Sequence, residues 1–293
     1  MKYKKALKIN IGILCLGFFG LLYDLPVASG PAPPILDSPS YLVMDPDTQT
    51  IIYGRNVHAR RAPASTTKMI TILLALEMGN PNDLVTISHR ACVESGSGLG
   101  LCEGEKVPLW DLARATIVKS GNDGAFAIAE HLGGSIQGFA DLMNQRAHQL
   151  GMNDTHFANP DGMPDDNHYS SAFDLALLAS EAMKQDDFRD WVSSKEVHFD
   201  TFGNRSDVKF ENTNQLLDMY PFANGVKTGY TDLAGFCVVA SATFREKTLI
   251  AVVLGCERNQ QWPEAIQLFD YGFILYDPDY QEFQDLYEHG AVF

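Results

Sequence analysis

The chain has 293 residues and a formal net charge of −15 at pH 7, from 22 lysines and arginines against 37 aspartates and glutamates. So acidic a chain is not expected to bind nucleic acid or to be held on anionic lipid by charge, because both would repel it. Hydrophobic residues make up 45% of the chain. That fraction supports a sizeable core, in one large domain or two small ones.

Residues 1–29 have the pattern of a secretory signal peptide. Four lysines lie within the first eight residues, an apolar run follows over residues 9–22, and small residues stand at Val27-Ala28-Ser29. The run is short for a membrane span. We expect export to the periplasm or another extracytoplasmic part of the cell envelope, with no membrane attachment unless the signal stays uncleaved. Cleavage would remove four lysines and one aspartate and change the formal net charge from −15 to −18.

After a Pro-rich linker at residues 30–39, the pattern predicts a folded domain over residues 40–278 and an acidic C-terminal tail at 279–293 that carries no basic amphipathic helix. Residues 80–108 and the loop at 159–168 appear irregular in pattern. The expected elements are, in chain order, strands at 41–44 and 50–53, helices at 65–78, 109–118, 124–131, 135–150 and 171–183, strands at 197–202, 207–210, 225–229, 236–243 and 248–254, and a helix at 263–276.

This order, with strands at both ends and helices between them, predicts an α+β fold. We expect an α/β sandwich in which one antiparallel sheet is built from both ends of the chain and an all-helical lobe is inserted. The functional site should lie between the sheet and the lobe.

Four cysteines follow the expected signal peptide, and an exported chain permits disulfides. A turn centred on Glu246-Lys247 between the last two strands would place Cys237 directly opposite Cys256. These two thiols are then expected to be in contact, either as a disulfide or as two small reduced core residues. A second candidate pair, Cys92 and Cys102, flanks a glycine-rich loop.

The helix after Pro63 is apolar on every face, so we expect it to be buried, yet it carries Lys68. An unpaired interior charge is costly, and burial lowers the pKa of a lysine. Lys68 lies one turn after Ser65 on the same face, so it is placed to take the proton of that serine. Ser-x-x-Lys also occurs from Ser206 to Lys209, where an extended strand would point the two side chains to opposite faces.

Two further short motifs, Ser120-Gly121-Asn122 and Lys227-Thr228-Gly229, each occur once as Ser-x-Asn and Lys-Thr-Gly. Alone, the first is typical of a capped turn and the second of an exposed edge strand. Together with Ser65-x-x-Lys68, and in this order, they match the motif set of penicillin-recognising serine enzymes.

The sequence around these motifs resembles the low-molecular-mass D-alanyl-D-alanine carboxypeptidases, which are penicillin-binding proteins of peptidase family S11. The resemblance covers residues 40–276 and is carried mainly by the segments 63–68, 120–123 and 224–232. It implies a fold like that of the serine β-lactamases and transpeptidases, the peptidoglycan pentapeptide stem as substrate, β-lactam antibiotics as inhibitors, and no cofactor or metal. Larger members carry a second β-rich domain and an amphipathic C-terminal anchor, which the acidic tail here does not resemble.

The resemblance also implies catalytic roles. Ser65 attacks the carbonyl of the penultimate D-alanine, Lys68 takes its proton, and Ser120 relays a proton toward the leaving amine. An acyl-enzyme forms on Ser65 and water releases it.

The implied substrate-binding residues surround this centre. Asn122 holds a substrate amide, and Lys227 and Thr228 hold the terminal carboxylate. Gly229 lets another backbone come close, and the backbone N–H groups of Tyr230 and Ser65 form the oxyanion hole. Arg258 is either a further contact to the carboxylate or a solvated side chain.

Rival activities of the same fold stay open. A class A β-lactamase needs a deacylating glutamate on a loop after the Ser-x-Asn motif, and residues 159–168 hold Asp161, Asp165 and Asp166 but no glutamate. The motifs do not separate a D,D-carboxypeptidase from a D,D-endopeptidase or a transpeptidase, because these differ in the group that is released or that accepts the acyl chain.

Two alternatives come from other classes. A zinc D,D-peptidase would need closely spaced histidine ligands, and His156 and His168 lie in loops without a helical partner. A non-catalytic wall-binding protein would be expected to have lost Ser65 or Lys68, and both are present.

Overall fold

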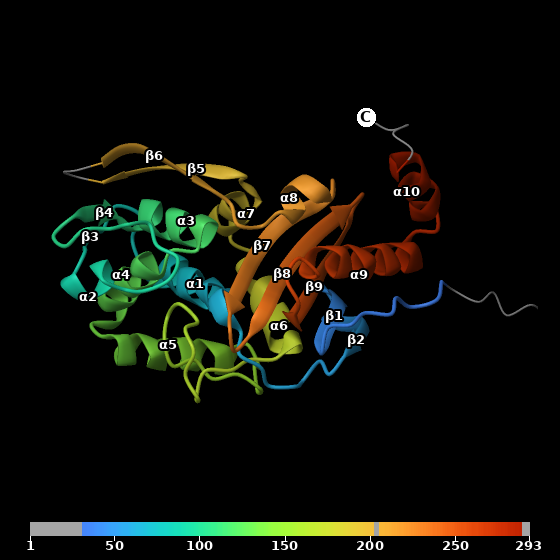
Figure 1. Ribbon diagram of the computed structural model, residues 1–293, viewed down its shortest axis with the longest axis horizontal. Helices are drawn as coiled ribbons and strands as arrows, with labels where there is room; N and C mark the ends of the chain where they lie inside the picture. The colour runs from blue at the N-terminus through green and yellow to red at the C-terminus, as the bar shows by residue number, and fades with distance from the viewer. Residues whose placement is uncertain (1–30, 202–204, 289–293) are drawn as a thin grey trace, which may run out of the picture. The chain divides into compact units, whose positions relative to one another are not determined.

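A computed structural model of the chain describes residues 31–201 and 205–288 (Figure 1). The expected signal peptide lies outside these residues and stays a prediction. One antiparallel sheet of five strands has the order β2-β1-β9-β8-β7. The strands are β1 (Ser40–Asp45), β2 (Thr50–Arg55), β7 (Ala223–Thr231), β8 (Gly235–Phe244) and β9 (Lys247–Cys256). Because β1 pairs with β9, the sheet joins both ends of the chain, which confirms the expected α+β class.

Helices cover both faces of this sheet, and the alternation of side chains along β1 explains why. Leu42 and Met44 pack into the core formed with α1 (Lys68–Met78) and α6 (Ala172–Ala182). Tyr41 and Val43 point to the opposite face and pack with α9 (Gln261–Tyr276). A strand buried on both faces reads as a continuous apolar run, which is how residues 41–44 appear in the sequence.

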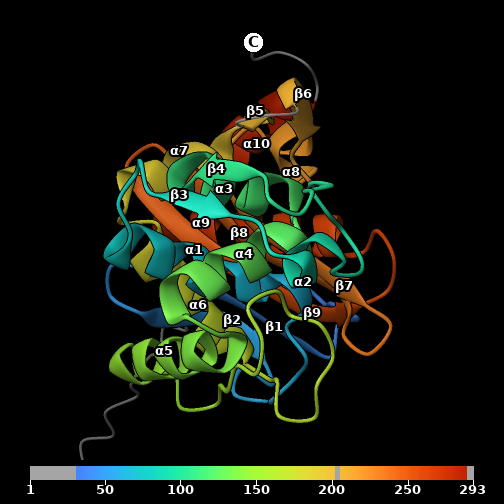
Figure 2. The same ribbon diagram turned by 90° about the vertical axis from the view of Figure 1, so that its left-hand side faces the viewer.

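The helical lobe lies beside β7 and faces the viewer in Figure 2. It contains α3 (Leu109–Lys119), α4 (Asn122–Gly133) and α5 (Ile136–Gln149), close to their expected bounds. The expectation that residues 80–108 are irregular is wrong in part. Two three-residue strands, β3 (Leu84–Thr86) and β4 (Lys106–Pro108), pair there, and α2 (His89–Cys92) lies between them. Elements this short leave no periodic signal in the sequence.

The remaining elements lie before β7 and after α9. β5 (Glu196–Thr201) and β6 (Arg205–Glu211) pair with each other outside the main sheet. Helices α7 (Asp186–Ser193), α8 (Leu216–Met219) and α10 (Tyr280–Glu288) were not expected. In the acidic tail, the Tyr280 hydroxyl donates to Asp270 on α9 at 2.5 Å and so ties α10 to that helix. No helix in the described part of the chain has the length and apolar character that crossing a membrane requires.

The expected register of the β8–β9 hairpin is wrong. The turn is Arg245-Glu246, one residue earlier than expected, so Cys237 lies opposite Leu254. A shift between Phe236 and Cys237 then places Cys256 opposite Phe236. Burial raises the pKa of the Cys237 thiol to about 11 and that of Cys256 to about 12. The cysteines of the described residues are all free thiols: Cys92, Cys102, Cys237 and Cys256.

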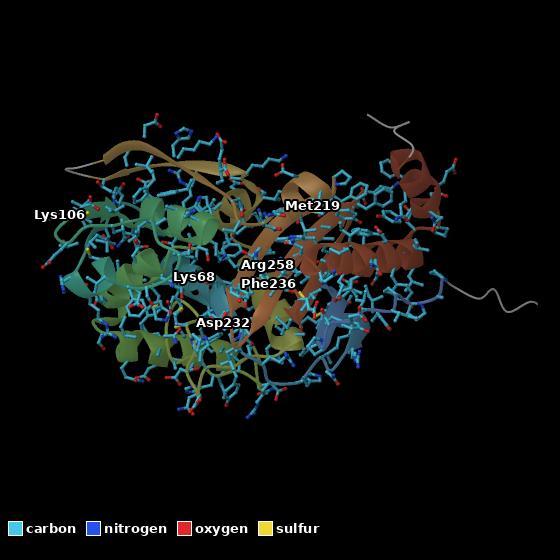
Figure 3. All side chains as sticks on the ribbon, viewed as in Figure 1. Lys68, Lys106, Met219, Asp232, Phe236 and Arg258 are labelled. Carbon is cyan, nitrogen blue, oxygen red and sulfur yellow. The ribbon has the colours of Figure 1, made fainter. Side chains whose placement is uncertain are left out.

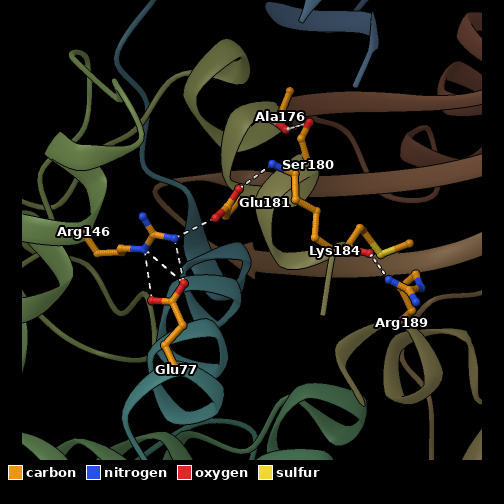
Figure 4. A network of polar contacts seen from close by, with 8 residues as sticks. Glu77, Arg146, Ala176, Ser180, Glu181, Lys184 and Arg189 are labelled. Carbon is orange, nitrogen blue, oxygen red and sulfur yellow. Dashed lines mark hydrogen bonds and ion pairs between the residues drawn. The ribbon is translucent and has the colours of Figure 1, made fainter. Parts of the chain in front are cut away.

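Arg146 on α5 joins this helix to α1 and α6 through two carboxylates (Figure 4). Its Nε and Nη2 donate to Glu77 on α1, and Nη2 also donates to Glu181 on α6 at 2.8 Å. The three side chains are only 19%, 23% and 25% exposed. This partly buried, multidentate pairing is therefore stronger than an isolated surface ion pair.

Replacing Arg146 by methionine should lower the free energy of unfolding by about 1–3 kcal/mol, because two partly buried carboxylates lose their cation. Urea unfolding at pH 7 measures the loss. Arg189→Met is the matched control. Its partner Asp186 is 89% exposed, so the control should lose less than about 1 kcal/mol. Equal losses in the two variants would contradict the assigned role of Arg146.

Candidate active site

Ser65 lies on a single 3-10 turn (Ala64–Thr67) that leads directly into α1. The residue before it, Ala64, has φ of +49°, a left-handed conformation that is costly for a residue with a Cβ atom. Strain of this kind persists where the surrounding structure enforces it and is common at functional sites. The expectation that α1 is buried on every face is confirmed from Lys68 to Ala75 but not in its last turn, where Met78 is 47% exposed.

Lys68 is completely buried, and its ammonium donates to three oxygens. They are Ser65 Oγ at 2.9 Å, Asn122 Oδ1 at 2.7 Å and the backbone carbonyl of Asp161 at 2.8 Å. Burial lowers the pKa of Lys68 to about 8, against the opposing negative charges of Asp161 and Asp123. A lysine with this pKa is accessible as a neutral amine near neutral pH, which is what a proton acceptor for Ser65 requires.

The Ser-x-Asn motif forms the sharp turn between α3 and α4. Ser120 ends α3 with φ of +69° and is 6% exposed. Asn122 is the first residue of α4, and its Nδ2 donates to the Ser95 carbonyl at 2.6 Å. Asp123 lies in the first turn of α4 and accepts from the backbone N–H of Leu99. These bonds fix the loop of residues 95–101 over the turn.

The Lys-Thr-Gly motif lies on β7. Lys227 is 1% exposed, and burial, with the nearby charge of Lys68, lowers its pKa. The hydroxyls of Thr228 and Thr213 are 2.7 Å apart. A Cβ atom on Gly229 would lie 2.9 Å from the Ser65 backbone nitrogen, so a glycine is needed for β7 to approach the 3-10 turn.

The three motifs meet at one cleft of about 490 Å³. Ser65, Ser120 and the β7 residues 228–230 line it, and the hydrogen bonds of Lys68 bring Asn122 to the same place. Further lining side chains, which the sequence patterns did not indicate, include Thr213, Gln215 and Trp262. A hollow of similar size, about 460 Å³, lies around Arg245 and Asp277 and contains none of the motif residues.

The family model for D-alanyl-D-alanine carboxypeptidases, peptidase S11, matches residues 28–258. The chain belongs to the S11 family. It is 36% identical over 252 residues to D-alanyl-D-alanine carboxypeptidase DacF of Bacillus subtilis, a match that covers 82% of this chain and 63% of DacF. The chain thus spans less than two thirds of that relative.

Two matches from Streptomyces K15, one in sequence and one in structure, cover nearly the whole length of the matched chain. The D-alanyl-D-alanine carboxypeptidase of Streptomyces sp. strain K15 is 32% identical, with 94% of this chain and 100% of that protein covered. The crystal structure of the Streptomyces K15 DD-transpeptidase superposes with a TM-score of 0.79 at 32% identity, covering 83% of this chain and 99% of that one. The family and the penicillin-binding fold expected from the sequence are therefore confirmed.

In this S11 chain, the loop at residues 159–168 packs directly against the 3-10 turn that carries Ser65. Gly162 has φ of +91°, and a Cβ atom there would lie 1.8 Å from the Ala64 carbonyl. Asp161 is 1% exposed, and burial raises the pKa of its carboxyl group. The loop therefore braces the strained turn and supplies one of the three acceptors of Lys68.

His168 in the same loop is a structural side chain. Its Nδ1 accepts from the Ala158 N–H at 3.0 Å, so its Nε2 donates to the Thr67 hydroxyl at 2.8 Å. Burial lowers the pKa of His168 to about 4, which keeps the ring neutral. Within residues 31–201 and 205–288 no group of three or more histidine, cysteine or acidic side chains is arranged to hold a metal ion.

Figure 3 shows Lys68, Phe236, Arg258 and Asp232 gathered where the sheet meets the lobe, with Lys106 at the far edge of the lobe. The Arg258 guanidinium stacks on the Phe236 ring at 5.6 Å. This contact places Arg258 at the rim, since Phe236 itself lines the cleft.

Proposed function

We propose that the chain is a serine D,D-carboxypeptidase. It removes the terminal D-alanine from peptidoglycan stem peptides through an acyl-enzyme on Ser65, and penicillin inhibits it by acylating the same oxygen. The observation that carries the proposal is the 2.9 Å contact from the buried Lys68 ammonium to Ser65 Oγ at the floor of the cleft. Incubation with a muropeptide that ends in D-Ala-D-Ala tests it, with loss of one alanine read by mass spectrometry. An unchanged muropeptide mass would refute it.

In the proposed acylation, the neutral Lys68 amine takes the proton of Ser65 as Oγ attacks the penultimate carbonyl. The negative charge that develops on the carbonyl oxygen is held by the backbone N–H groups of Ser65 and Tyr230. The absence of a side chain at Gly229 allows the two N–H groups to lie close enough to share one oxygen. The position of Ser65 at the start of α1 adds the positive end of a helix dipole.

The leaving amine needs a proton, which we assign to the Ser120 hydroxyl. Its left-handed turn directs it into the cleft, where it is a lining residue together with Ser65. Asn122 keeps one of its two Nδ2 hydrogens bonded to Ser95, so the other is left to hold a substrate amide carbonyl. Water then attacks the acyl-enzyme and regenerates Ser65.

The terminal carboxylate is assigned to the Thr228 hydroxyl and the Lys227 charge. Amidating the C-terminus of the substrate should lower kcat/KM by roughly 10- to 100-fold, because a charge-assisted hydrogen bond is replaced by a neutral one beside a buried cation. Parallel rate measurements on the acid and the amide of one peptide check this. Equal rates on the two would remove Thr228 and Lys227 from the carboxylate site.

A transpeptidase is the second candidate, and one observation favours it. The Streptomyces K15 structure, which matches over nearly its full length, is named a DD-transpeptidase. Adding an amine acceptor such as glycine to the muropeptide reaction separates the two activities, because a transpeptidase exchanges the terminal D-alanine for glycine. A β-lactamase would instead turn over penicillin rapidly, and the loop at 159–168 has no glutamate for that step.

The proposed substrate also requires the chain to reach the cell wall. We therefore propose that residues 1–29 direct export, residues 30–39 act as a linker, and the domain of residues 40–278 works on the extracytoplasmic side. The mass of the protein recovered from the cell envelope checks cleavage after residue 29.

A further inference from the structure

A further hollow, of about 330 Å³, lies at the corner where β9 leads into α9. We refer to it as the acidic hollow. It is lined by residues 37–39 before β1, residues 255–257 at the end of β9, and Gln260 and Glu264 at the start of α9. Three of these residues, Asp37, Glu257 and Glu264, carry carboxyl groups, and no lysine, arginine or histidine of the described chain is among the lining residues.

Glu264 is the buried carboxylate of the acidic hollow. Its side chain belongs to a residue that is 4% exposed, whereas the other two carboxyl-bearing residues are exposed. Glu264 Oε1 accepts from the Ser38 backbone N–H at 3.3 Å, but Oε2 has no hydrogen-bond partner among the described residues. The Arg61 guanidinium lies against Gly255 and donates nothing to this oxygen. Because a buried carboxylate oxygen without a donor is costly, a ligand or water is expected to supply one.

The walls of the acidic hollow favour one kind of cation. The chain as a whole has a net charge of −15, so its field also attracts cations. In the described part of the chain no three histidine, cysteine or acidic side chains are arranged to hold a metal ion. A guanidinium binds best when both oxygens of one carboxylate are free, and Glu264 offers only one. A primary ammonium is a point charge with three donors and needs only single acceptors.

We propose that the acidic hollow binds a primary alkylammonium group, either the end of an aliphatic diamine or the side chain of a lysine. The ammonium donates to Glu264 Oε2, the alkyl chain packs against Pro39, and the exposed carboxylates supply negative charge at the mouth. The site is separate from the catalytic cleft and does not depend on the activity of the cleft. The two sites share only the start of α9, where Gln261 and Trp262 line the cleft.

Calorimetric titration at pH 7 and constant ionic strength tests the proposal with three probes. They are 1,5-diaminopentane, Nα-acetyl-lysine methylamide and the uncharged alcohol pentanol. Both amines should bind with a Kd of roughly 1–10 mM, as is usual for ligands this small, and pentanol should not bind. If the diamine binds about three- to tenfold more tightly than the lysine derivative, its second ammonium meets the carboxylates at the mouth and the ligand is a free diamine. Equal affinities assign the site to a lysine side chain.

Glu264→Gln should weaken the binding of both amines by at least about tenfold, because a charge-assisted hydrogen bond is lost. The amide oxygen can still accept from the Ser38 N–H. Without ligand, this variant should keep its thermal unfolding midpoint or gain about 1–3 °C, since a buried charge is removed. The double variant Asp37→Asn and Glu257→Gln changes only exposed side chains and should weaken both amines by about two- to fivefold.

Glu246→Gln is the matched control. Glu246 is exposed in the turn before β9, at the other end of a ten-residue strand and so about 30 Å from the acidic hollow. This variant should bind both amines like the wild type.

Three results would overturn the proposal. The first is amine binding that is absent from the wild type or unchanged in Glu264→Gln. The second is tighter binding of calcium chloride than of either amine, which would make the hollow a metal site. The third is a thermal midpoint of Glu264→Gln that falls by several degrees without ligand, which would show that the carboxylate only holds the fold together.

Discussion

The variant Ser65→Ala should form no covalent adduct with benzylpenicillin, whereas the wild-type protein should gain the mass of one penicilloyl group. The reason is that the adduct is an ester on Ser65 Oγ, which accepts from the Lys68 ammonium and belongs to a residue that lines the cleft. Release of D-alanine should fall by at least about 10⁴-fold, as for other residues that act as one catalytic unit. Mass spectrometry of the intact protein reads the first effect and amino-acid analysis the second.

Ser193→Ala serves as the control for this prediction. Ser193 is an exposed serine at the end of α7, with its hydroxyl on the Asp190 carbonyl at 3.2 Å. It should acylate like the wild type. An adduct that persists in Ser65→Ala would show that another group is the nucleophile. Fast turnover of penicillin by the wild type, without an accumulating adduct, would instead favour a β-lactamase.

Replacing Lys68 by methionine should lower the acylation rate by about 10³-fold or more, because the proton acceptor is lost. The fold should survive with only a small change in stability, because the relief of a buried charge is offset by the loss of the donor to Asn122 Oδ1 and to the Asp161 carbonyl. If the acylation rate falls while the thermal unfolding midpoint is retained, Lys68 acts in catalysis and not only in holding the fold together. A large drop in stability would contradict this reading.

The pKa of Lys68 also predicts how the wild type responds to pH. Acylation should rise with pH through about 8 as the amine becomes neutral. Between that value and the ordinary 10.5 of an unfolded lysine, the unfolded chain holds more protons than the folded one, so stability should increase with pH across this window. Lys68→Met should lack the first effect and reduce the second, because Lys227, whose pKa burial also lowers, is still present. A pH-independent acylation rate in the wild type would argue against Lys68 as the base.

That Ser65, Lys68, Ser120 and Lys227-Thr228-Gly229 belong to one candidate site could be predicted because the sequence signal of each is local. A lysine on an apolar helix, a serine one turn before it and two short motifs are each readable within a few positions. The glycine in Lys227-Thr228-Gly229 is explained by a contact that only the structure measures, its 2.9 Å approach to Ser65. Contacts between residues far apart in the sequence have no local sequence signal and could not be predicted in this way. The Asp161 carbonyl that accepts from Lys68 is a backbone atom, and every residue carries one.

The errors in the fold have the same origin. The hairpin register depended on which two residues turn, and a choice one residue too late moved Cys237 away from Cys256. A β-bulge at Gly255, which has φ of +77°, shifts the pairing by one residue and partly corrects this register error. A single glycine in an apolar strand is not enough to predict such a bulge. Helix α10 is stabilised by tyrosine hydroxyls on Asp270, which are tertiary contacts rather than local helix signals.

The pairing of β1 with β9 joins the two ends of the domain, and this affects when the newly synthesised chain can fold. Ser40 and Leu254 meet across this pair, so the central sheet stays incomplete until nearly the whole domain has been synthesised. Contacts this distant in sequence form late and slowly. The turn that carries Ser65 packs against Gly229 on β7, and β7 pairs with β8, which pairs with β9. We therefore expect a nascent chain that already contains Ser65 and Lys68 to be inactive until β9 has paired with β1. The time at which penicillin labelling begins would measure when this pairing occurs.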